Sequence, residues 1–178
     1  MSTRTAEVLG AALEAARTRG IDRMIIASTT GRTALELCAM IDGADVRPVI
    51  VAHRAKPQGD EFQDAARKAL AEKRIVLFRQ TDRRALPRVL HRIIRKLTMS
   101  SWQAKLKAVK ASQGTGICVC HKILWMMIQS GSLAPGEVVA VAGRKEGADS
   151  AGAFLIPGQK RWPVLLSVII RPAPGEPS

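Results

Sequence analysis

The amino-acid sequence predicts an α/β fold: a three-layer α/β/α sandwich around a mostly parallel sheet of about five strands. Short apolar runs without polar alternation, such as Met24 to Ala27, are typical of strands that are covered on both faces. Segments of helical periodicity alternate with these runs, which favours parallel strands joined by right-handed crossovers. Towards the C-terminus the connections between strands become short, so we expect an antiparallel strand there.

The first half of the chain opens with a helix over residues 5–19, which ends at Gly20. The apolar run that follows is a strand, and Leu35, Leu37, Cys38 and Ile41 then fall on one side of a helix. The predicted elements after the opening helix are a strand at 23–28, a helix from Gly31 to about Ile41, a turn at Asp42–Asp45, a strand from Val46 to His53, a loop at Lys56–Asp60, a helix at 61–72 and a strand from Arg74 to Arg79.

The second half begins with two predicted helices and ends with three predicted strands. In order, these elements are helices at 84–97 and 101–111, a flexible junction at Gln113–Gly116, a very apolar helix from about Ile117 to Ile128, and strands at Glu137–Gly143, Ala151–Ile156 and Val164–Ile170. The Pro- and Gly-rich tail over 172–178 is expected to fray. Because we find no internal repeat and no boundary, we expect residues 1–178 to form a single domain.

The charge balance is strongly basic, with 28 Lys and Arg against 15 Asp and Glu, for a formal net charge of +13. Much of the excess lies in the segment 73–110. Such a field attracts phosphates, nucleic acid or acidic partners. A solvated helix face explains the same charges, and only Phe78 and Trp102 could stack on bases there.

Several classes of protein are disfavoured by the composition. No run of eighteen apolar residues is present, so we expect no transmembrane helix and no membrane partner. The N-terminal residues lack the apolar core of a signal peptide, which favours a cytoplasmic location. The three cysteines are too few for a disulfide framework and suit the same compartment.

The turn after the first strand, Ser28-Thr29-Thr30-Gly31-Arg32-Thr33, is the most informative local feature. Ser and Thr are good N-cap residues, and glycine lets the backbone approach a ligand closely. Free N–H groups, hydroxyls and a positive helix end would then meet at one spot and form an anion site. A well-capped helix explains the same residues, and neither G-x-x-x-x-G-K-[ST] nor G-x-G-x-x-G is present.

Four blocks of sequence in this order resemble the C-terminal domain of pyruvate kinase, most closely the stand-alone prokaryotic proteins similar to that domain. They are the strand and turn Ile25–Ala34, the strand Val49–His53, the segment Gln113–Pro135 with its Gly-x-Gly and apolar helix, and Glu137–Gly143 followed by Gly147-Ala148-Asp149-Ser150-Ala151. A closing strand that ends in Ile170-Arg171-Pro172 also fits.

The resemblance implies a regulatory or small-molecule-binding domain without the catalytic barrel of the kinase, so kinase activity is not implied. It also implies that the serine- and threonine-rich turn holds a phosphate of an allosteric sugar phosphate. Our own expectation is wider: the turn binds a phosphorylated metabolite or nucleotide, either a sugar phosphate or a flavin mononucleotide-like ligand. The carboxyl ends of the other strands would complete the site. The predicted ligand-binding residues are Ser28, Thr29, Thr30, Gly31, Arg32, Thr33, His53 and a turn of Gly147, Ala148 and Asp149.

Three other interpretations remain open at this point. The basic segment 73–110 would make the protein nucleic-acid-associated. His53 and Asp149 would serve an unrecognised enzyme, although we predict no catalytic residues. Cys118-x-Cys120-His121 invites a metal site, but these helical spacings do not converge on one ion, so no metal is predicted. A homo-oligomer is compatible with the sequence.

Overall fold

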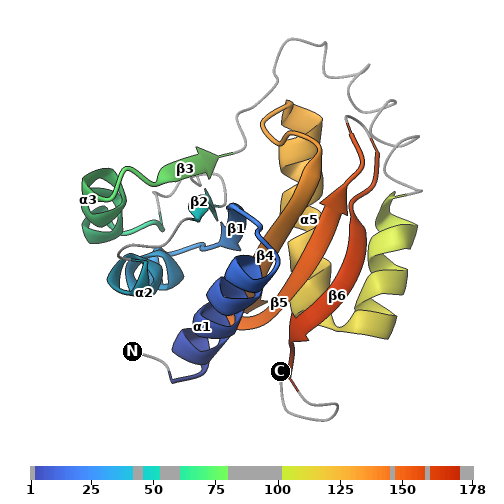
Figure 1. Ribbon diagram of the computed structural model, residues 1–178, viewed down its shortest axis with the longest axis horizontal. Coiled ribbons are helices and arrows are strands. Elements are labelled where there is room, and N and C mark those ends of the chain that lie inside the picture. Colours follow the sequence, from blue (N-terminus) through green and yellow to red (C-terminus); the bar gives the residue numbers. More distant parts are fainter. Residues whose placement is uncertain are drawn as a thin grey trace.

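The computed structural model describes residues 3–41, 46–52, 61–79, 102–144, 147–158 and 161–172. Within them six strands form one mixed sheet in the order β3-β2-β1-β4-β5-β6, flanked by helices on both faces (Figure 1). The predicted α/β class, with a mostly parallel sheet and antiparallel pairing near the C-terminus, is confirmed. The six strands correspond to the six strand segments predicted from the sequence, although the sheet was expected to have about five.

The parallel part of the sheet is built around β1 (Arg23–Ala27). This strand pairs in parallel with β2 (Arg47–Ala52) on one side and with β4 (Gly136–Arg144) on the other. The short strand β3 (Val76–Arg79) adds to the outer edge of β2, again in parallel. The carboxyl ends of these strands therefore meet at one edge, where ligands commonly bind in such sheets.

The antiparallel part consists of β5 (Gly147–Ile156) and β6 (Val164–Ile170). The predicted turn at Gly147, Ala148 and Asp149 is wrong, because these residues are the first three of β5. Pairing with β4 continues down to Arg144 and Gly147, with a register shift beside Gly143, so the hairpin connection is very short. Gly and Asp are uncommon in strands, which is why the sequence pattern placed the start of β5 too late.

Three helices cover one face of the sheet: α1 (Thr3–Thr18), α2 (Arg32–Met40) and α3 (Asp64–Glu72) (Figure 1). On the other face lies α5 (Thr115–Ser130), together with the helical residues 102–113. The break between these two helices lies at Gly114, within the predicted junction over 113–116, but the other three residues of that junction are helical. The predicted turn at 42–45, loop at 56–60 and helix at 84–97 lie outside the described residues, as does nearly all of the tail.

The sheet separates two apolar cores. The core under α1 includes Leu9, Met24 and Ile50, and the core under α5 includes Ile25, Leu124 and Phe154. Neighbouring residues of one strand thus enter different cores, as Met24 and Ile25 do, because side chains alternate across a sheet. This burial on both faces explains why the strands appear in the sequence as continuous apolar runs.

Three helices end in the same backbone motif, in which the last turn closes with paired i−3 and i−5 hydrogen bonds. Gly20 ends α1 and Gly131 ends α5, both with positive φ. At the end of α3 the equivalent residue is Arg74, the one non-glycine residue with positive φ in the described part of the chain (φ 54°). An arginine therefore occupies a conformation that favours glycine.

Arg23, at the start of β1, ties the sheet to the loop between α5 and β4. Its guanidinium donates hydrogen bonds to the carbonyl oxygens of Ala134 (2.7 Å), Pro135 (3.0 Å) and Glu137 (3.3 Å). The fork of donors in one arginine thus binds three backbone acceptors at this edge.

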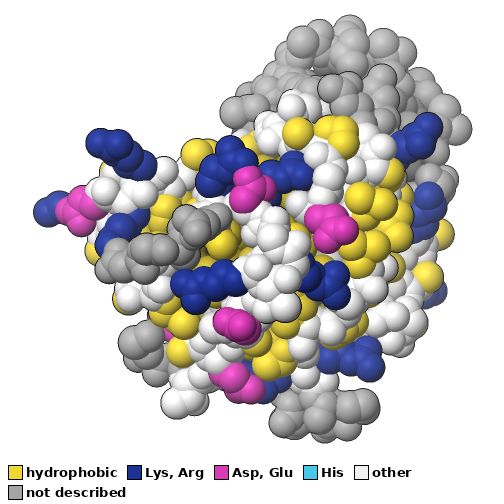
Figure 2. Space-filling view, viewed as in Figure 1, with side chains coloured by type: hydrophobic (Ala, Val, Ile, Leu, Met, Phe, Trp, Pro, Cys, Tyr) yellow, Lys and Arg dark blue, Asp and Glu magenta, His cyan; other side chains and the backbone are white. Residues whose placement is uncertain are grey.

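The described surface mixes basic, acidic and apolar side chains. On the face shown in Figure 2, Lys and Arg are spread over the molecule and do not gather in one patch. Of the helices that the structure describes, none combines the length and the apolar character needed to cross a bilayer.

Candidate functional site

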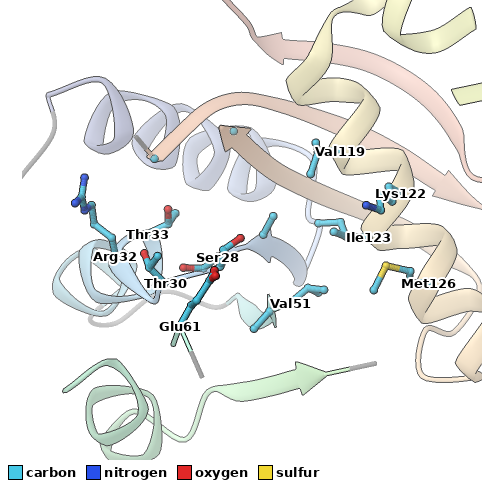
Figure 3. A pocket seen from close by; sticks show the side chains of 15 residues that line it. Ser28, Thr30, Arg32, Thr33, Val51, Glu61, Val119, Lys122, Ile123 and Met126 are labelled. Atoms are coloured by element: carbon cyan, nitrogen blue, oxygen red, sulfur yellow. The ribbon is translucent and has the colours of Figure 1, made fainter. Parts of the chain in front are cut away.

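A cavity of about 540 Å³ opens at the carboxyl ends of β1 and β2, between the turn that follows β1 and the helix α5. Figure 3 shows Ser28, Thr30 and Thr33 on one side and residues of α5 on the other. The described residues that line it are Ala27, Ser28, Thr29, Thr30, Arg32, Thr33, Val51, Ala52, Glu61, Val119, Lys122, Ile123, Met126, Gly143 and Gly147. Five of the six residues of the predicted phosphate turn therefore line one cavity.

The turn passes directly into α2. Gly31 is the N-cap residue, with a left-handed backbone (φ 91°), and the first hydrogen bond of the helix runs from the N–H of Leu35 to the carbonyl of Gly31 (2.9 Å). The N–H groups of Arg32, Thr33 and Ala34 precede that bond and have no acceptor within the helix. These amides and the positive end of the helix dipole lie beside the cavity, which is an arrangement suited to an anion.

The predicted capping by hydroxyl groups is wrong. No described hydrogen bond joins Ser28, Thr29 or Thr30 to an amide of α2, because Gly31 intervenes in a left-handed conformation. Ser28 and Thr33 are each only 5% exposed, yet neither hydroxyl bonds to another described residue. Both residues line the cavity, and their hydroxyl oxygens are accessible from it, so their hydrogen-bonding capacity is unused within the described part of the chain. A bound polar group would use it.

Gly31 does not line the cavity and has a different role from the predicted one. A Cβ at this position would lie 2.5 Å from the Cβ of Ala66 and 3.4 Å from the ring of Phe62. The residue is therefore a glycine because α3 packs against it. The N–H of Gln63 also donates to the carbonyl of Thr30 (3.0 Å), so the start of α3 holds the turn in place from behind.

Of the described residues around the cavity, three carry a charge. Lys122 projects from α5 opposite the turn, and Arg32 extends from the start of α2 away from α5 (Figure 3). The carboxylate of Glu61 lies on the same side as Ser28 and Thr30. Lys122 is the cation best placed to face an anion at the amides of α2, while Glu61 limits how much negative charge the cavity accepts.

The remaining wall is apolar and was not predicted from the sequence. Val119, Ile123 and Met126 of α5 form it with Val51 of β2. These α5 residues follow the i, i+4, i+7 spacing of one helix face, and Lys122 lies between them. That spacing was the available signal, but a helix that is apolar almost all round does not show which face meets a ligand.

The other predicted site residues are placed differently. Gly147 lines the cavity, whereas Ala148 is buried in the core under α1. Asp149 lies against the first turn of α5, where it accepts a hydrogen bond from the hydroxyl of Ser150 (2.7 Å), and a Cβ on Gly116 would clash with both side chains. Asp149 is not among the residues lining the cavity. His53 lies outside the described residues.

The residues of the considered metal motif point in different directions. The thiol of Cys118 approaches the carbonyl of Leu106, and that of Cys120 approaches the carbonyl of Ala140, both at 3.5 Å. Burial raises the pKa of both thiols, so both are protonated at neutral pH. In the described chain no group of three or more His, Cys, Asp or Glu side chains is arranged to hold a metal ion.

His121 belongs to an aromatic cluster beneath α5. Its ring stacks on Trp162 (centroids 5.5 Å apart) and meets Phe154 edge to face (4.9 Å), while Trp125 also contacts Trp162. The side chain is 3% exposed and its Nδ1 has no hydrogen-bond partner within the described chain. Burial lowers its pKa to about 4, so the ring is neutral at physiological pH.

The predicted nucleic-acid segment 73–110 is described only at 73–79 and 102–110. In the second part Lys107 and Lys110 are exposed, and Lys105 lies over the ring of Trp162 at 5.8 Å. The chain was also compared with models of known protein families, and none of them matches it.

Proposed function

We propose that the chain is a regulatory or ligand-binding domain that holds a phosphorylated metabolite or nucleotide in the cavity at the end of β1. The resemblance to the C-terminal domain of pyruvate kinase supports the same assignment. One observation carries the proposal: the hydroxyls of Ser28 and Thr33 and the first amides of α2, which have no acceptor within the helix, lie across a cavity from Lys122.

The chemistry of these groups favours a phosphate over a carboxylate. A phosphate offers three terminal oxygens, and the turn supplies amide donors, the hydroxyls of Ser28 and Thr33, and a lysine opposite them. A helix terminus contributes about 0.3–1 kcal/mol to such an interaction, and up to about 2 when partly buried. The turn is held by α3 before any ligand arrives, which lowers the cost of ordering it on binding.

Isothermal titration and thermal-shift measurements with inorganic phosphate, a sugar phosphate, a nucleoside monophosphate and flavin mononucleotide test the proposal. Lys122→Gln removes the opposing cation and should weaken binding of a responding compound about tenfold. The matched control is Lys107→Gln, which alters an exposed lysine on the helical residues 102–113 and should leave the affinity unchanged.

A second variant reverses the sign of the effect. Glu61→Gln removes a negative charge that lines the cavity, so it should strengthen the binding of every phosphate compound. If none of the four phosphate compounds binds, or if the wild type and Lys122→Gln bind a compound with equal affinity, a phosphate site here is contradicted.

A further inference from the structure

The two sides of the cavity differ in what they offer a ligand. The side formed by the turn carries hydroxyls and amides, whereas the side formed by Val51, Val119, Ile123 and Met126 carries no hydrogen-bonding side-chain group apart from Lys122. A sugar ring against this wall would leave its hydroxyls without partners, at a cost of about 1–3 kcal/mol for each unpaired group. The wall therefore favours an apolar body next to the phosphate.

The apolar wall continues along the same strands towards their amino ends. Ala27 and Val51 line the first cavity, and Ile25 and Val49, two residues earlier and on the same face of the sheet, line a second cavity of about 720 Å³. On α5 the lining passes likewise from Met126 to Met127. The second cavity is also lined by the basic residues Arg23, Arg47, Lys73 and Arg74, and no described residue lines both cavities. The apolar room next to the turn is therefore that of the first cavity.

The uneven distribution of helices explains this apolar wall. The helices α1, α2 and α3 all pack on the opposite face, and α5 lies mainly over β1, β4 and β5. Within the described residues no helix is centred over β2 and β3 on the face of α5. Apolar side chains of β2 thus line both cavities beside α5.

We propose that the ligand of this protein is a phosphate monoester of an apolar organic group. This inference rests on the proposed phosphate site. The phosphate lies at the amides of α2 and faces Lys122, while the organic group lies against Ala27, Val51 and Met126 in the first cavity.

A series of straight-chain alkyl phosphates from ethyl to octyl, titrated calorimetrically below their micelle concentrations, tests the inference. Each buried CH₂ should raise the affinity about fourfold. Octyl phosphate should therefore bind far more tightly than inorganic phosphate or a hexose phosphate. Met126→Gln and Val119→Thr make the wall polar at nearly constant volume. Each should lower the affinity for octyl phosphate about tenfold relative to the affinity for inorganic phosphate. Leu166→Gln, on the exposed side of β6 (43% exposed), is the matched control.

The outcomes separate the two proposals. Affinity that does not change with chain length, or tighter binding of the hexose phosphate, overturns the apolar ligand and leaves the phosphate site standing. The absence of binding by every phosphate compound overturns both. Sedimentation with vesicles that carry phosphate monoester headgroups should pellet no protein, and pelleting without binding of monomeric esters would assign the site to a lipid surface instead.

Discussion

Replacement of Gly31 by alanine tests whether α3 sets the shape of the turn. The new methyl group would lie 2.5 Å from the Cβ of Ala66, well inside van der Waals contact, on a backbone with φ 91°. Left-handed backbone at a residue with a Cβ costs about 1–2 kcal/mol. Overpacking in a filled core costs typically about 1–3 kcal/mol more. We therefore expect Gly31→Ala to lower the free energy of unfolding by about 3 kcal/mol, and Tm by about 6–12 °C.

The matched control is Gly20→Ala, since Gly20 also has positive φ (64°) but a Cβ there would meet no atom within 4 Å. It should lose only the backbone contribution of about 1–2 kcal/mol. Urea unfolding followed by circular dichroism gives both values. Ala66→Gly removes the methyl group that the new Cβ at position 31 would overlap. In this background Gly31→Ala should therefore lower the free energy of unfolding by less, with only the backbone contribution left. Equal losses for the two glycines, or no change in that background, would refute the argument that α3 requires a glycine at position 31.

Three further predictions concern the framework around the site. Arg74→Gly should raise the urea midpoint, with a gain of about 1 kcal/mol, because it removes a side chain from a left-handed helix end; a lower midpoint would contradict this. Arg23→Leu should cost about 1–2 kcal/mol in the same assay by releasing three carbonyl acceptors, and Arg23→Lys should not restore it because lysine lacks the fork of donors. His121 has its pKa lowered to about 4, so the folded state disfavours its protonation and stability should fall as the pH drops from 6.5 to 4, by up to about 3 kcal/mol. The difference between the wild type and His121→Phe in the free energy of unfolding, measured against pH, isolates this contribution. If the two curves run parallel, His121 does not supply it.

Much of the fold was accessible from the sequence because burial on both faces leaves a direct trace in it. The strand around Ile25 and Ile26 appears as an uninterrupted apolar run, since one side chain enters each core. The antiparallel end followed from the short connections between the last strands. The start of β5 was missed because Gly147 and Asp149 have low strand propensity, and the strand extends over them because Gly147, Ala148 and Ser150 pair with β4.

The candidate site was accessible only in part. The turn from Ser28 to Thr33 was visible because hydroxyl residues and a glycine follow a buried strand. The real role of Gly31 depends on Ala66, thirty-five positions later in the chain, and no local pattern contains that contact. No local pattern shows that Lys122 and Met126 belong to the site either, because they face the turn across the cavity only through the packing of α5 on the sheet.

The central claim is that a phosphate binds at the start of α2. Backbone amide chemical shifts, followed by two-dimensional NMR while inorganic phosphate and then octyl phosphate are added, test it most directly. We predict that the amides of Arg32, Thr33 and Ala34 show the largest shifts with both compounds, and that Lys122→Gln reduces them. Unchanged amides at these three residues, with both compounds at millimolar concentration, would contradict the account.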